Sequence, residues 1–73
     1  MSPRATAIEI EVNGTRRDVA AGTTLLALVE SLGLKKELIA VEVNRQLVRR
    51  KNLESHRLVP GDRVEILEFV GGG

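Results

Sequence analysis

The strict alternation over residues 7–12 is the feature that most constrains how this 73-residue chain can fold. One set of positions is apolar and the set between them is charged: Ile8, Ile10 and Val12 alternate with Glu9 and Glu11. A period of two predicts a β-strand with one buried face and one solvated face. Asn13-Gly14 follows at once, and this dipeptide accepts the positive φ angles of a two-residue hairpin turn. We therefore predict that residues 15–19 return antiparallel to the first strand.

One amphipathic helix is predicted after this hairpin. Apolar residues recur with the spacing i, i+3, i+4 and i+7, namely at Leu25, Leu28, Val29 and Leu32. Thr23 or Thr24 can cap the N-terminus of such a helix, and Gly33 stands where a left-handed C-terminal cap is common. The helix should therefore have about two to three turns, enough to cover one face of a sheet.

The second half of the chain predicts further strands. Residues 38–43 alternate again, with Ile39, Val41 and Val43 on one side. Turn-forming residues 44–46 follow, and the short apolar pair Leu47-Val48 could pair back. Residues 49–57 are polar and largely basic, which predicts a loop or a single helical turn.

The last predicted strand completes an α+β fold. Pro60-Gly61-Asp62 predicts a turn, and residues 63–70 form the strand that follows it. A mixed sheet of four to five strands, with the main helix packed on one face, accommodates the hairpin, the helix and these strands. In the ubiquitin-like β-grasp arrangement the last strand would lie beside the first, a pairing that periodicity alone does not prove. The length suits one domain over residues 1–73.

The alternation breaks within the last strand. Val64 and Ile66 are expected on the side of the strand that faces the core, but Leu67 and Phe69 fall on the opposite side, together with Glu65. Two outcomes are open. Either a β-bulge returns Phe69 to the core, or Leu67 and Phe69 form an exposed apolar patch that binds a partner.

Composition excludes several classes of function. The formal net charge is +1 and Phe69 is the only aromatic residue, so neither a phosphate-attracting field nor a stacking surface for nucleic acid is expected. No apolar stretch is long enough to cross a membrane, and the N-terminal segment lacks the pattern of a secretory signal, so we expect a cytoplasmic protein. The absence of cysteine leaves no thiolate to bind zinc or to carry sulfur.

Three consecutive glycines, Gly71 to Gly73, follow the last strand directly. Without Cβ atoms this segment is expected to be flexible and exposed, and about 10 Å of extended chain could thread into the active site of a partner. A frayed end or an expression remnant has the same composition. The position of the glycines, straight after an apolar strand, favours a functional tail. A phosphate-binding loop is excluded because no helix follows the glycines.

No side chains form a recognisable catalytic or metal site. His56 is the only histidine and is expected at the surface. The basic residues Arg45, Arg49, Arg50, Lys51 and Arg57 could face an acidic partner, although a solvated surface is the more usual explanation of such residues.

Three segments resemble the ThiS family of bacterial sulfur carriers: Glu42-Val43-Asn44, the run from Pro60 to Ile66, and the ending from Phe69 to Gly73. The resemblance extends over nearly the whole chain. It implies a β-grasp domain that is a substrate and not an enzyme. Two features depart from the family pattern: the basic run Arg49-Arg50-Lys51 is heavier than expected, and the N-terminal extension over residues 1–6 has no assigned role.

The resemblance also implies a chemistry at the chain end. An E1-like enzyme (ThiF) would use ATP to adenylate Gly73, a donor such as a cysteine desulfurase would supply sulfur, and the thiocarboxylate would serve thiazole synthase (ThiG). Gly71 and Gly72 would thread the tail, and no cofactor would be bound. A carrier for molybdopterin synthesis or tRNA thiolation, or a plain ubiquitin-like interaction module, remains the alternative.

Overall fold

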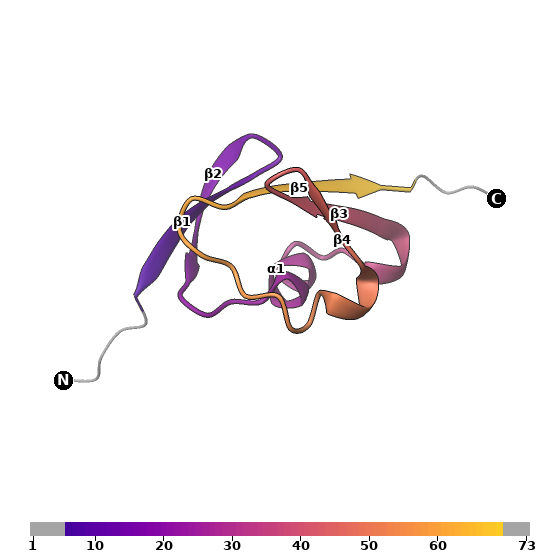
Figure 1. The fold of residues 1–73 in the computed structure, drawn as a ribbon, viewed down its shortest axis with the longest axis horizontal. Helices are drawn as coiled ribbons and strands as arrows, with labels where there is room; N and C mark the ends of the chain where they lie inside the picture. The colour runs from indigo at the N-terminus through magenta and orange to yellow at the C-terminus, as the bar shows by residue number, and fades with distance from the viewer. Residues whose placement is uncertain (1–5, 70–73) are drawn as a thin grey trace.

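A five-stranded mixed sheet forms one layer of the computed structural model, which describes residues 6–69 (Figure 1). Its strands are β1 (Ala7–Val12), β2 (Thr15–Ala20), β3 (Ile39–Val43), β4 (Gln46–Val48) and β5 (Arg63–Glu68). Their order across the sheet is β2-β1-β5-β3-β4. β1 and β5 run parallel, and the other neighbours are antiparallel. The last strand therefore does lie beside the first, as the β-grasp arrangement requires.

Helix α1 (Leu25–Ser31) packs against one face of this sheet (Figure 1). The backbone N–H of Ala27 donates to Oγ1 of Thr24 over 3.1 Å, so Thr24 is the N-terminal cap. At the other end Gly33 has a φ of +75°. The N–H groups of Gly33 and Leu34 donate to the carbonyls of Glu30 and Val29, the pattern of a Schellman motif. The predicted caps are thus confirmed, and they limit the helix to two turns.

Both hairpins turn on an asparagine with positive φ. Asn13 and Gly14 have φ of 50° and 83°, and Asn44 and Arg45 have φ of 51° and 70°. Positive φ at both central positions matches the right-handed twist of the flanking strands. The first hairpin has its predicted turn. The predicted pairing of Leu47-Val48 with the preceding strand is also confirmed, because these residues lie in β4, which pairs antiparallel with β3.

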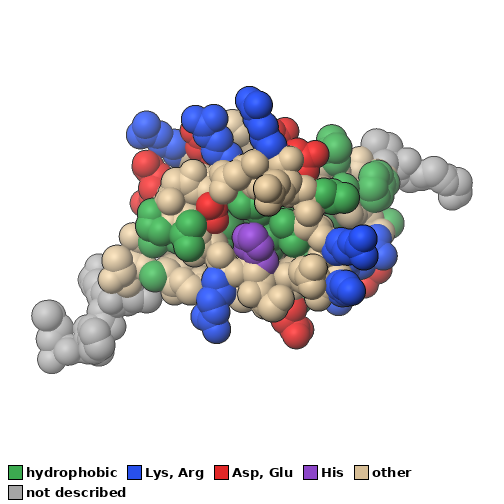
Figure 2. Space-filling model, viewed as in Figure 1, with side chains coloured by type: hydrophobic (Ala, Val, Ile, Leu, Met, Phe, Trp, Pro, Cys, Tyr) green, Lys and Arg blue, Asp and Glu red, His purple; other side chains and the backbone are tan. Residues whose placement is uncertain are grey.

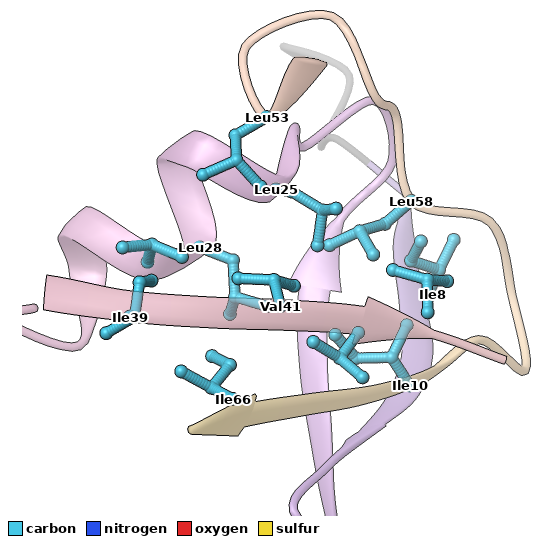
Figure 3. Packing of buried hydrophobic residues seen from close by; sticks show 12 residues of the cluster. Ile8, Ile10, Leu25, Leu28, Ile39, Val41, Leu53, Leu58 and Ile66 are labelled. Atoms are coloured by element: carbon cyan, nitrogen blue, oxygen red, sulfur yellow. The ribbon is translucent and has the colours of Figure 1, made fainter. Parts of the chain in front are cut away.

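The core lies between the sheet and α1 (Figure 3). Its members are the inward residues of the strands, the helix stripe and two leucines from irregular chain: Ile8, Ile10, Leu25, Leu28, Val29, Ile39, Val41, Val43, Leu53, Leu58, Val64 and Ile66. Leu53 and Leu58 belong to the segment between β4 and β5, whose regular structure is the 3₁₀ turn η2 (Arg50–Asn52) and an isolated bridge at Arg57. This segment closes the core on the side that α1 leaves open.

Three predicted strand boundaries were wrong. β2 extends to Ala20, one residue beyond its predicted end. Leu38 belongs to the 3₁₀ turn η1 (Lys36–Leu38) and is exposed, so β3 begins one residue later than predicted. β5 ends at Glu68, which is short of the predicted residue 70; Val70 itself lies outside the described residues. Between residues 6 and 69 no helix is long and apolar enough to cross a membrane.

Candidate functional site

Strand β5 leads the chain toward the glycines and is held from both sides. β3 pairs with it along its length, from Val43 opposite Val64 to Ile39 opposite Glu68. β1 pairs only with its first half, at Arg63 and Val64. The final residue of this segment is also fixed, because the N–H of Phe69 donates to the carbonyl of Leu38 over 2.8 Å. The chain is therefore anchored up to the residue that precedes Val70.

The side chain of a turn asparagine, Asn13, bonds to β5 beyond the point where β1 stops pairing with it. The side chain of Asn13 accepts a hydrogen bond from the N–H of Ile66 over 2.8 Å and donates to the carbonyl of Ile66 over 3.3 Å. An amide side chain can mimic a backbone partner in this way because it carries one acceptor and one donor group. Asn13 thus continues the hydrogen bonding of β5 beyond the last backbone pair.

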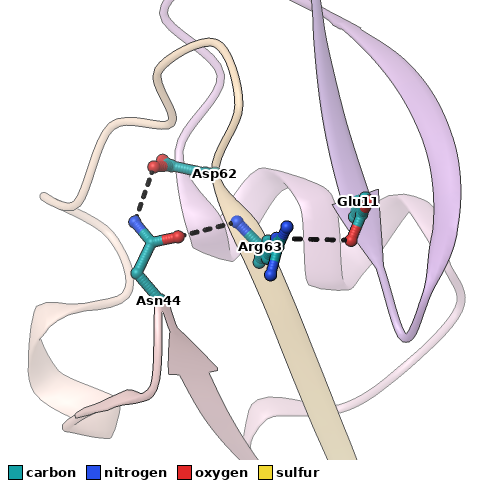
Figure 4. A network of polar contacts seen from close by, with 4 residues as sticks. All are labelled: Glu11, Asn44, Asp62 and Arg63. Atoms are coloured by element: carbon teal, nitrogen blue, oxygen red, sulfur yellow. Dashed lines mark hydrogen bonds and ion pairs between the residues drawn. The ribbon is translucent and has the colours of Figure 1, made fainter.

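A second turn asparagine fixes the start of β5 from the opposite side (Figure 4). Oδ1 of Asn44 accepts from the N–H of Arg63 over 3.0 Å, and Nδ2 of Asn44 donates to Oδ1 of Asp62 over 3.0 Å. Asp62 is 5% exposed, and its Oδ2 also accepts from the N–H of Val59 over 2.9 Å. The ion pair between Arg63 and Glu11, at 3.7 Å, is solvent-exposed and contributes little.

Leu67 and Phe69 are exposed, which decides between the two outcomes left open by the sequence. Their exposed fractions are 64% and 57%. β3 and β5 stay in register up to Glu68, so no bulge returns Phe69 to the core. Beyond Ile66 the outward face of β5 is therefore apolar rather than polar.

Two further residues extend this surface into an apolar patch, defined as Ala40, Leu47, Leu67 and Phe69. Ala40 lies directly opposite Leu67, and Leu47 on β4 points to the same outer face and is 67% exposed. Ala40, Leu47 and Phe69 line a hollow of about 220 Å³, and Phe69 also lines a second hollow of about 320 Å³ with Leu38 and Lys35. Hydrophobic side chains gather at the right-hand end of Figure 2, next to the point where the described chain ends.

The remaining residues that the sequence singled out do not come together at one place in the structure. Gly71, Gly72 and Gly73 lie outside the described residues. Arg49 and Arg50 line the smaller hollow beside Phe69, whereas Arg45 lies in the β3–β4 turn and Arg57 forms an isolated bridge with Thr24. His56 is half-buried, and within residues 6–69 no cluster of His, Cys, Asp or Glu could hold a metal ion.

Sequence reasoning missed Ala40 and Leu47 as members of the patch, and Lys35 as its neighbour. A signal for Leu47 was present. A two-residue turn at Asn44-Arg45 places Leu47 opposite Glu42, on the outer face, once β4 is accepted as a strand. Lys35 gave no such signal, because its position depends on how η1 packs.

Comparison with known proteins defines the class to which this fold belongs. A solved structure of the thiamine biosynthesis protein ThiS from Geobacter metallireducens superposes with a TM-score of 0.77 at 30% identity, covering 90% of this chain and all of that one. The fold is therefore a ubiquitin-like β-grasp, as predicted. The apolar patch lies on the outer face of its sheet, close to the end of the described chain.

The family follows from the sequence matches. The model of the ThiS family matches residues 10–73. Sulfur carrier protein ThiS of Escherichia coli is 29% identical over 66 residues, which cover 90% of this chain and 100% of that protein. The chain belongs to the ThiS family. This membership confirms the predicted resemblance to the ThiS family.

Two matches are to larger proteins, and both of these are named as thiazole synthases. A thiazole synthase of Magnetococcus marinus is 38% identical over 66 residues, and the chain spans only 20% of the length of that relative. A segment similar to this chain thus occurs within a single polypeptide that is named as a thiazole synthase.

Proposed function

We propose that this chain is a sulfur carrier of thiamine biosynthesis whose reactive group is the carboxylate of Gly73. The observation that carries the proposal is the anchoring of β5: hydrogen bonds fix the chain up to Phe69, and a run of glycines follows one residue later. A rigid domain that ends in residues without side chains suits delivery of a carboxylate into a narrow active site. Family membership supports the same chemistry.

The proposed chemistry has two steps, both in the active site of a partner. In an E1-like adenylating enzyme, a Gly73 carboxylate oxygen attacks the α-phosphorus of ATP, and pyrophosphate leaves. A donor such as a cysteine desulfurase carries the sulfur as a persulfide. Two electrons from a thiol reductant, which ends as a disulfide, release this sulfur as hydrosulfide, and the hydrosulfide then attacks the acyl carbon. AMP leaves with the former carboxylate oxygen, and Gly73 ends as a thiocarboxylate. In this proposal the partner supplies the acid, the base and any metal for these steps, and the chain acts as a substrate. We place the reaction in the cytoplasm, as the sequence predicts.

The proposed acceptor of the sulfur is a thiazole synthase. The Magnetococcus relative supports this assignment, because it joins a segment similar to this chain to a protein with that name. Two functions that act in succession gain from being in one polypeptide, since the local concentration of each for the other is high. We propose that the apolar patch, with Leu67 and Phe69 at its centre, packs against the adenylating partner while Gly71 and Gly72 thread the tail.

The mass of the intact chain tests the proposal. The purified chain, incubated with a ThiF-type adenylating enzyme, ATP and a sulfur donor, should gain the mass of one oxygen-to-sulfur exchange, located in its C-terminal peptide. A variant that lacks Gly73 is the matched control and should keep its original mass, because its end stops short of the reacting phosphate. An unchanged mass of the full chain, in a mixture that thiolates the E. coli carrier, would reject the function.

A further inference from the structure

The folded chain separates its charges, although its formal net charge is only +1. Five basic side chains lie on and beside the two 3₁₀ turns and are called the basic cluster here: Lys35, Lys36, Arg49, Arg50 and Lys51. Arg50 joins the two turns, because its Nε donates to the carbonyl of Lys36 over 3.0 Å and its Nη2 donates to the carbonyl of Glu37 over 3.3 Å. Residues far apart in the sequence thus form one basic surface.

The basic cluster borders the apolar patch on two sides. Arg49 and Arg50 line the hollow of about 220 Å³ that Leu47 and Phe69 share. Lys35 lines the hollow of about 320 Å³ on the side of Phe69 that faces η1. In Figure 2, Lys and Arg side chains gather beside hydrophobic ones at the end of the molecule where the described chain stops. Any protein that binds the apolar patch at Phe69 therefore meets this cluster.

The carboxylates of the described chain compensate this cluster only in part. All five basic side chains are exposed. Both ion pairs found within residues 6–69 lie elsewhere, between Arg16 and Glu9 and between Arg63 and Glu11. Glu9, Glu11, Glu42 and Glu65 lie on the outer face of the sheet, whereas Glu68 lines the same hollow as Lys35. The repulsion within the cluster would be relieved by negative charge on a bound partner.

We propose that the basic cluster is an electrostatic docking surface for a protein face rich in Asp and Glu around the opening that admits the tail. The inference rests on the proposed function, since it assumes that a partner receives the glycines. A protein fits better than a nucleic acid, because an apolar patch adjoins the cluster and Phe69 is the only aromatic residue of the chain. The cluster steers the encounter, and the apolar patch then holds the complex.

Charge reversal with a matched control tests the docking surface. The test variant carries Lys36→Glu, Arg49→Glu and Lys51→Glu, which leaves the hydrogen-bonding side chain of Arg50 in place. The control carries Arg16→Glu, Arg17→Glu and Arg45→Glu, on β2 and in the β3–β4 turn. Both variants change the net charge equally. The rate of association with the purified adenylating enzyme is measured at about 0.05 M and about 0.5 M NaCl.

The cluster variant should associate at least about tenfold more slowly than the unaltered chain at low salt, and the difference should nearly vanish at high salt. The control should fall by less than about threefold. Equal rates for the cluster variant and the unaltered chain, or an equal fall in the control, would overturn the proposal. So would tight binding of an RNA oligonucleotide that the cluster variant loses.

The same samples separate this inference from the proposed function. At saturating adenylating enzyme, the cluster variant should still be thiocarboxylated as fully as the unaltered chain. If the unaltered chain binds in a salt-dependent way but is never thiocarboxylated, the sulfur chemistry fails while the docking surface stands.

Discussion

Asp62 is the buried charged residue of the described chain, and its two carboxylate oxygens have separate tasks. One oxygen accepts from the N–H of Val59 and so closes the turn before β5, and the other holds the amide of Asn44. Burial of a carboxylate is tolerated only where such partners replace water. This single side chain therefore ties the β3–β4 turn to the start of the last strand.

Asp62→Ala should lower the free energy of unfolding by about 2–3 kcal/mol, because it leaves the N–H of Val59 and the amide of Asn44 without their acceptor. Urea unfolding followed by circular dichroism measures the change. Asp18→Ala, at an exposed position on β2, is the control and should stay within about 0.5 kcal/mol of the unaltered chain. A loss of similar size in both variants would show that the Asp62 contacts contribute nothing specific.

Asn13 combines a special backbone conformation with side-chain hydrogen bonds, and two substitutions separate them. Asn13→Gly keeps the positive φ but removes both hydrogen bonds to Ile66, which should cost about 1–2 kcal/mol. Asn13→Ala should cost about 1 kcal/mol more, because alanine resists positive φ. In both variants the amide hydrogen of Ile66 should exchange faster with solvent, measured by NMR. Unchanged exchange at Ile66, with the Phe69 amide as internal reference, would contradict this role.

At the scale of the element, β5 divides its residues between two tasks. Val64 and Ile66 face the core, whereas Leu67 faces solvent and forms part of the apolar patch together with Phe69, which directly follows the strand. Leu67 lies on the face that Glu65 occupies earlier in the strand, so the polar half of the alternation is replaced by apolar residues near the end. Large exposed hydrophobic groups placed together mark a binding surface more often than a folding requirement.

Phe69→Ser should therefore mainly weaken binding, whereas Ile66→Ala should mainly lower stability. Phe69→Ser should change the free energy of unfolding by less than about 1 kcal/mol, since more than half of the side chain is exposed, and should weaken binding to the adenylating partner at least about tenfold. Ile66→Ala should cost about 2–5 kcal/mol of stability. Calorimetric binding and thermal unfolding of both variants give the comparison. A loss of several kcal/mol from Phe69→Ser would place Phe69 in the core instead.

At the scale of the molecule, the sequence predicted those parts of the fold that depend on local rules. Alternation located β1 and β3, the cap residues located α1, and Asn13-Gly14 located the first hairpin. The pairing of β5 with β1, the apolar patch and the basic cluster depend on contacts between distant residues. Periodicity cannot show which strands become neighbours. The sequence therefore left two alternatives for Leu67 and Phe69, a bulge that buries Phe69 or an exposed apolar patch.

The role of the irregular segment between β4 and β5 also depends on contacts between distant residues, which the sequence did not predict. It was predicted as a loop or a single helical turn, yet Leu53 is 2% exposed and the N–H of Leu26 donates to its carbonyl over 2.9 Å. The segment is thus part of the core, although most of its side chains are polar.

Leu53→Ala should therefore destabilise the whole domain by about 2–5 kcal/mol, as much as a substitution within α1. Leu47→Ala, at a residue that is 67% exposed, is the control and should cost less than about 1 kcal/mol. Denaturant unfolding should stay a single transition in both variants. If Leu53→Ala instead left the midpoint unchanged, the segment would be a surface loop and not a wall of the core.

The place of β5 between β1 and β3 also has a mechanical consequence. A partner that grips the glycines and pulls along the strand direction loads the hydrogen bonds to β3 sideways, in shear, so that they resist together and do not open one after another. An edge strand such as β2 or β4, peeled away from its single neighbour, would give way far more easily. The central place of β5 therefore favours a domain that stays folded when a partner applies force to this strand.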